Sequence, residues 1–242
     1  MNIYKIIVQY KGTKYLGFQI QAQGQTIQGE INAVLKMLTK SEKVKTIGSG
    51  RTDAGVHALA QVMKLEIPLD IPATSLVRAM NANLPEDIRI IEAEVAAPDF
   101  HPIYSAKSKE YNYVFTTEKV ISPFVNELVT QFPFELDIEL MQKGCKLFCG
   151  EHDFINYQCV GTKVENTLRK IYSCELILCS STGHWAHLLG NYFVLKVEGN
   201  GFLKQMVRTI VGTIVEVGRG RRSPENLKEV LSSKDRGMAG RT

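Results

Sequence analysis

The chain has 242 residues, of which 44% are apolar, 22% charged and 8% aromatic. This is the composition of an ordinary globular protein, and it argues against intrinsic disorder, collagen and coiled coil. The formal net charge is only +4, but residues 201–242 hold nine Lys or Arg and four Asp or Glu. A local basic patch of this kind can attract a polyanion, although a solvated basic surface is the alternative.

The first residues alternate apolar and polar side chains and lack the layout of a signal peptide, and no apolar run is long enough to cross a bilayer. We therefore expect a soluble cytoplasmic protein with no membrane contact. The number of cysteines is odd and they lie within or beside apolar stretches, which predicts reduced core thiols rather than disulfides. They are Cys145, Cys149, Cys159, Cys174 and Cys179.

Hydrophobic periodicity predicts the order β-α-β-β-α-β in the first half of the chain. The predicted strands lie near 3–10, 43–48, 60–67 and 88–96, and the helices over 26–39 and 74–83.

The second half repeats this order but stops before its closing strand. A strand over 109–117, a helix over 137–149, strands near 169–179 and 191–198, and helices over 201–217 and 224–232 are predicted. Together these elements predict an α+β protein of two ferredoxin-like halves with a cleft between them, in which the last strand of the second half is missing. The halves span residues 1–104 and 105–242.

The densest polar motif is the segment Gly48 to His57, which lies between two predicted strands. Its glycines allow a tight loop that presents Arg51 and Asp53. Asp53 could act as a nucleophile or base, with Arg51 binding a phosphate or keeping the carboxylate ionised. The local pattern by itself favours an Asx turn at Asp53 and a structural hydrogen bond at His57. The spacing fits neither a Rossmann fingerprint nor a P-loop.

A second motif interleaves basic and aromatic residues at a strand start, in the segment Lys107 to Tyr113. Alternation places Tyr111 and Tyr113 on one face of this strand. RNA-binding proteins use such rings for base stacking and such cations for phosphates. An ordinary tyrosine-containing strand is the alternative.

The predicted helix over 201–217 places Lys204 and Arg208 together on its polar side. Periodicity alone makes Arg208 a solvated residue.

Two further polar clusters give weaker evidence of a functional site. Cys174, Cys179, His184 and His187 are close in sequence, but their spacing is too short for a zinc finger, so no metal site is expected. The residues Glu151 to Asp153 are interpreted as a loop or a helix cap.

Four motifs in register resemble the tRNA pseudouridine synthase A family. They are GRTDAGVHA at Gly50 to Ala58, SAKSKEYNY at Ser105 to Tyr113, GEHDF at Gly150 to Phe154 and GFLKQMVRTIVG at Gly201 to Gly212. The resemblance implies conversion of uridine to pseudouridine at positions 38 to 40 in the tRNA anticodon arm, by a homodimer that needs no cofactor and no metal.

The resemblance also implies roles for individual residues. Asp53 is the catalytic aspartate, Arg51 helps to flip or hold the nucleotide, Tyr111 lies against the target uracil, and Arg208 pairs with Asp53. Lys109 and Lys204 are expected to bind the substrate.

The chain departs from the family pattern in two places. Ile103 stands where the family usually has arginine, and the family usually continues beyond Thr242 with one more strand. Two alternatives therefore stay open: a tRNA-binding module of the same fold without catalysis, and a small-molecule enzyme that binds a phosphate in the Gly48–Gly55 loop.

Overall fold

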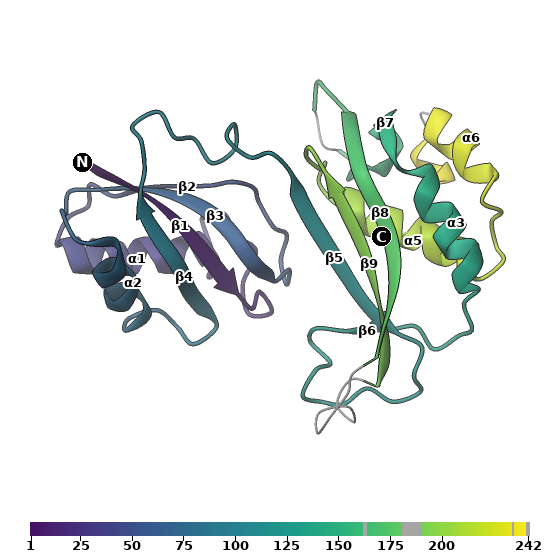
Figure 1. The fold of residues 1–242 in the computed structure, drawn as a ribbon, viewed down its shortest axis with the longest axis horizontal. Coiled ribbons are helices and arrows are strands. Elements are labelled where there is room, and N and C mark those ends of the chain that lie inside the picture. The colour runs from purple at the N-terminus through teal and green to yellow at the C-terminus, as the bar shows by residue number, and fades with distance from the viewer. Residues whose placement is uncertain (162–163, 181–189, 234, 241–242) are drawn as a thin grey trace. The chain divides into compact units, whose positions relative to one another are not determined.

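A computed structural model describes residues 1–161, 164–180, 190–233 and 235–240. The chain divides into two compact units, Met1–Ala106 and Lys107–Thr242, each with its own hydrophobic core. Both units combine a sheet with helices, so the protein belongs to the α+β class (Figure 1).

The first unit has the predicted β-α-β-β-α-β order. Its elements are β1 (Asn2–Tyr10), α1 (Ile27–Thr39), β2 (Lys45–Gly48), β3 (Ala58–Ile67), α2 (Ala73–Asn81) and β4 (Ile88–Val95). The four strands form one antiparallel sheet in the order β2-β3-β1-β4.

One face of this sheet carries the core of the first unit. Because side chains alternate along a strand, Tyr4, Ile6 and Val8 of β1 are buried while the intervening residues are more exposed. Helices α1 and α2 cover the buried face (Figure 1). The Thr26 hydroxyl caps α1 by accepting a hydrogen bond from the Gly29 N–H at 3.2 Å.

The second unit contains a five-stranded sheet in the order β6-β5-β9-β8-β7. Its β6 pairs parallel to β5, and the other neighbours are antiparallel. The strands are β5 (Lys109–Thr116), β6 (Thr130–Gln131), β7 (Gly150–Asp153), β8 (Leu168–Ser180) and β9 (Asn191–Gly199). The helices are α3 (Ile138–Leu147), α5 (Met206–Gly218) and α6 (Asn226–Ser232), with short 3-10 helices at Ile155–Tyr157 and Arg236–Met238.

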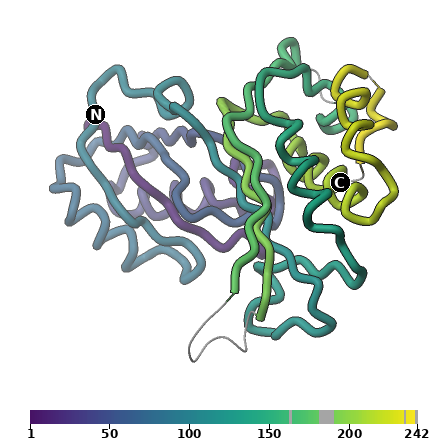
Figure 2. Tube along the Cα trace, turned by 45° about the vertical axis from the view of Figure 1, so that its right-hand side comes forward, coloured from purple at the N-terminus to yellow at the C-terminus, as the bar shows by residue number. Residues whose placement is uncertain are grey.

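The core of the second unit lies between its sheet and its helices. Phe115, Leu195 and Ile171 point from the sheet toward Met141 of α3 and Ile210 of α5, and all five side chains are buried. The long β8–β9 pair runs beside α3 in the tube view (Figure 2). Burial of one sheet face by helices gives this unit the same two-layer design as the first.

Three sequence-based predictions need correction in the second unit. The residues Glu151 to Asp153 form strand β7 rather than a loop or cap, because they pair with the start of β8, with His152 opposite Arg169. Helix α5 begins at Met206 rather than at residue 201. Cys149 is exposed, so it is not a core thiol; Cys145 and Cys174 are buried, and all five cysteines are free.

No strand follows α6 within the described residues, which end in the 3-10 helix at Arg236–Met238 and the segment after it. Strand β6 pairs with β5 only at Phe115 and Thr116. In the described part of the chain, the outer edge of β5 from Lys109 to Val114 therefore has no neighbouring strand. Among the described helices, none is both long and apolar enough to span a membrane.

Candidate functional site

The loop over residues 49–57 connects β2 to β3 and carries Asp53. Its first part is held by β3: the Ser49 N–H donates to the Val62 carbonyl at 2.8 Å, and the Gln61 amide donates to the Gly50 carbonyl at 2.6 Å. These bonds extend the β2–β3 pairing into the loop. The chain therefore leaves the sheet in a fixed direction just before Arg51.

The middle of this loop is fixed by the segment between β1 and α1. The Phe18 N–H donates to the Thr52 carbonyl at 3.1 Å, and the Tyr10 hydroxyl lies 2.8 Å from the Thr52 hydroxyl. Gly17 has a φ of 107° and lies so close that an added Cβ would be 2.7 Å from the Thr52 carbonyl oxygen. Only glycine combines this φ with this close approach.

Asp53 is half-buried at the centre of the loop. The turn is closed by the main chain, because the Val56 N–H donates to the Asp53 carbonyl at 3.2 Å. Within the described residues the Asp53 carboxylate makes no hydrogen bond and no ion pair, so the Asx turn is absent and Arg51 does not pair with it. The carboxylate is thus available to a ligand while the backbone around it is fixed.

The other two side chains of this motif differ in their surroundings. Arg51 is exposed. His57 accepts a hydrogen bond from the Gly12 N–H at its Nδ1 atom, at 3.1 Å. His57 therefore has the structural role that the local pattern favours, whereas Arg51 can reach solvent and ligand.

In the second unit, Tyr111 lies near the start of β5, in the part of the strand that does not pair with β6. It pairs with Val197 of β9, and its ring meets Phe202 edge to face with centroids 5.0 Å apart. Phe202 follows β9 and precedes α5. No role was predicted for Phe202, although it stands directly after the glycine-containing turn at residues 199–201.

Lys109 is the first residue of β5 and lies on the same face of the strand as Tyr111. Partial burial, and after it the positive charge of Arg169, lower the pKa of the Lys109 ammonium from its usual value. Burial also lowers the pKa of the Arg169 guanidinium. Arg169 was not among the predicted site residues, because no local motif surrounds it.

Lys204 and Arg208 are both exposed. The prediction that they lie together on one face of a helix is wrong. Lys204 lies in a turn before α5, and Gln205 has a left-handed φ of 62°, which interrupts any helix through residue 204. Arg208 lies in the first turn of α5. The chain therefore changes direction between the two cations.

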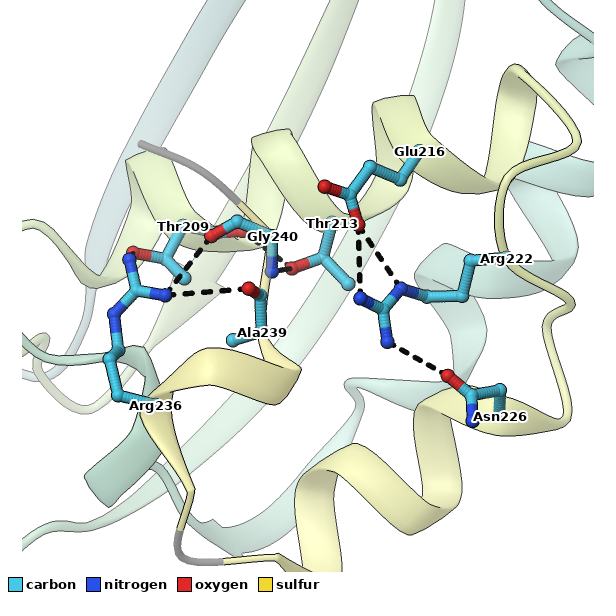
Figure 3. A network of polar contacts seen from close by, with 8 residues as sticks. All are labelled: Thr209, Thr213, Glu216, Arg222, Asn226, Arg236, Ala239 and Gly240. Carbon is cyan, nitrogen blue, oxygen red and sulfur yellow. Dashed lines mark hydrogen bonds and ion pairs between the residues drawn. The ribbon is translucent and has the colours of Figure 1, made fainter.

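Helix α5 is held by the segment that follows α6 (Figure 3). The Gly240 N–H donates to the Thr213 hydroxyl at 2.9 Å, and Arg236 donates to the Thr209 hydroxyl at 3.5 Å and to the Gly240 carbonyl at 3.2 Å. Further along, Arg222 and Glu216 form an ion pair at 3.0 Å. These contacts fix the helix that carries Arg208.

No cluster of three or more metal-ligating side chains occurs in the described part of the chain. Of the four residues considered for zinc, His184 and His187 lie outside the described residues.

A family model described as "tRNA pseudouridine synthase" matches residues 6–105 and 145–242. The first matched segment includes Arg51 and Asp53, and the second includes Arg208. Lys109 and Tyr111 lie between the two segments.

Curated relatives match the whole chain. A tRNA pseudouridine synthase A of Anoxybacillus flavithermus is 38% identical and aligns over 100% of this chain and 94% of its own length. Proteins of the same name from an Exiguobacterium species and from Lysinibacillus sphaericus are each 40% identical, over 100% of this chain and 93% and 95% of their own lengths. A solved chain titled "Crystal Structure of a Cbf5-Nop10-Gar1 Complex" aligns over 88% of this chain and 45% of its own length, with 18% identity and a TM-score of 0.32.

The chain therefore belongs to the tRNA pseudouridine synthase family. As a member of this family it is an isomerase that converts uridine to pseudouridine in tRNA.

Proposed function

We propose that Asp53 is the catalytic carboxylate of this isomerase. The observation that supports the proposal is the half-buried Asp53 side chain, which has no partner among the described residues although its backbone is fixed on both sides. A group kept in one place and left without a structural bond suits contact with a substrate. Arg51, two residues earlier and exposed, would hold or help to flip the target nucleotide.

The reaction leaves the composition of the nucleotide unchanged. The bond between N1 of uracil and C1′ of ribose breaks, the base turns, and C5 forms the new bond to C1′. The C5 proton is lost and N1 gains a proton. Asp53 promotes cleavage of the first bond, by attack on the ribose, by attack on the base or by proton abstraction. Because nothing is oxidised or reduced, the reaction needs no redox cofactor.

The remaining site residues come from the second unit. We propose that Tyr111 lies against the target uracil, that Arg208 pairs with Asp53, and that Lys109 and Lys204 bind the tRNA. In this proposal each of the two units is a ferredoxin-like half. The exposure of Arg208 and Lys204 supports their access to a polyanion.

The resemblance to the family also supports a more specific substrate and assembly. We propose that the target uridines are those at positions 38 to 40 of the anticodon arm, and that the enzyme acts in the cytoplasm as a homodimer. Light scattering of the purified chain would measure twice the monomer mass if the dimer forms.

The test uses unmodified tRNA that carries tritium at C5 of its uridines, because formation of the new bond releases this hydrogen to water. We expect release with the unchanged chain and none with Asp53→Asn, which should still bind tRNA. Asp70→Asn is the matched control, since Asp70 is exposed and lies beyond the opposite end of β3. Equal release from Asp53→Asn and the unchanged chain would refute the role of Asp53. If all the proteins, including the unchanged chain, bind tRNA but none releases tritium, the non-catalytic tRNA-binding module is favoured.

A further inference from the structure

Two cations lie near each other on one face of the second sheet. Gly199 of β9 pairs with Lys109 of β5 on one side and with Ile171 of β8 on the other. Directly paired residues point to the same face of a sheet, and Arg169 shares the face of Ile171 because it is two residues away. Gly199 itself has no side chain, and the atoms of Ile171 and Phe202 lie 3.1 Å and 3.4 Å from the position that a Cβ on it would take.

The electrostatic surroundings of this pair are unusual. Lys109 and Arg169 are both partly buried, and the charge of Arg169 disfavours the protonated form of Lys109. Over the described ranges, neither side chain has a carboxylate within ion-pair distance. The nearest acid in sequence, Glu110, lies on the opposite face of β5 and pairs with Lys196 at 2.7 Å. Two like charges held together in this way are stabilised when an anion joins them.

Arg169 is also held in a fixed orientation. Its Nη1 atom donates to the carbonyls of Asn166 at 3.0 Å and Leu168 at 2.6 Å. Its Nε atom lies 3.8 Å from the position that a Cβ on Gly201 would occupy. Only one of the guanidinium nitrogens is used by these carbonyls, so the planar group keeps donors for a ligand with phosphate geometry.

Aromatic side chains stand directly beside the cations. Tyr111 lies two residues from Lys109 on the same strand face, and its ring contacts Phe202. Phe202 directly follows Gly201, which Arg169 approaches. Cations next to partly exposed aromatic rings are the arrangement with which proteins bind single-stranded RNA, where rings meet bases and cations meet phosphates.

We propose that Lys109 and Arg169 together bind one phosphate of the RNA backbone, next to the nucleotide at Tyr111. The proposal rests on the proposed function, because it assumes that tRNA occupies this part of the second unit. It assigns a binding role to Arg169, and it specifies that Lys109 binds the same phosphate as Arg169.

The experiment measures the dissociation constant of unmodified tRNA as a function of salt for the unchanged chain, Lys109→Gln, Arg169→Gln and the double variant. Loss of one phosphate contact flattens the plot of log affinity against log salt by about 0.7 to 0.9, which is about 5- to 8-fold weaker binding at about 0.1 M salt. Since both cations hold the same phosphate, we expect each single variant to show most of this loss of affinity of about 5- to 8-fold. The double variant should be weaker by much less than the product of the two.

Lys170→Gln is the matched control, because Lys170 is the exposed neighbour of Arg169 and points to the other face of β8. Its salt dependence should stay close to that of the unchanged chain. Arg169→Lys keeps the charge and should recover part of the affinity. Lys109→Gln removes no hydrogen bond between described residues, so it tests the proposal even if Arg169→Gln is unstable.

Three results would overturn the proposal. They are unchanged slopes in both single variants, fully multiplicative losses in the double variant, or an equal loss in Lys170→Gln. Tritium release by the same samples separates this failure from failure of the proposed function. If the unchanged chain releases tritium while these variants bind tRNA normally, only the phosphate site is wrong.

Discussion

The backbone N–H of Phe18 donates to the carbonyl of Thr52 at 3.1 Å, immediately before Asp53. This bond joins the segment after β1 to the loop between β2 and β3, two parts of the chain that no local motif connects. Asp53 is therefore positioned by a contact between loops as well as by the turn in which it lies. The same contact explains why Gly17 leaves no room for a side chain.

Gly17→Ala should disturb the Asp53 loop. A methyl group at Gly17 combines an unfavourable φ with a 2.7 Å approach to the Thr52 carbonyl oxygen. Gly55→Ala is the control, because Gly55 has a φ of 79° but nothing within 4 Å of an added Cβ. We expect Gly17→Ala to lower the free energy of unfolding by about 1 kcal/mol more than Gly55→Ala does. Urea denaturation measures this difference, and equal losses would show that the loop moves to admit the methyl group.

Thr213→Val should loosen the packing of the segment after α6 on α5. The buried Thr213 hydroxyl accepts the Gly240 N–H at 2.9 Å and donates to the Thr209 carbonyl at 2.7 Å. Valine keeps the volume but leaves the Gly240 N–H without its acceptor, which costs about 1 to 3 kcal/mol. Thermal or urea unfolding would detect the loss. Thr117→Val, at an exposed position, should change stability little, and a similar effect of both variants would contradict the explanation.

Affinity for tRNA should fall toward alkaline pH through Lys109. Burial and the charge of Arg169 lower the pKa of the Lys109 ammonium, so it loses its proton at a lower pH than an ordinary lysine. Only the protonated form attracts a phosphate, so binding weakens as the proton leaves. Dissociation constants between about pH 7 and about pH 10 would record this fall. Lys109→Arg, which stays charged, should remove most of it, while Lys170→Arg should not; equal profiles for all three proteins would contradict the assignment.

The order of the elements could be predicted from the sequence because it follows local periodicity. The alternation in β1 and the spacing of Ile27, Ile31 and Leu35 in α1 describe which residues one face of a sheet or helix can bury. Strand β7 was missed because it has only four residues and is defined by its pairing with β8. The start of α5 was predicted too early because periodicity cannot detect the left-handed conformation of Gln205.

The sequence by itself determined the order of elements in the first unit, most elements of the second, the motif around Asp53 and the resemblance to a family. Each of these is carried by residues close together in the chain. Only the tertiary structure decided that Asp53 has no structural partner among the described residues, that Gly17 lies against Thr52, and that Lys109 and Arg169 share one sheet face. These relationships depend on strand register and on contacts between loops, and residues far apart in the chain come together only when the sheets pair.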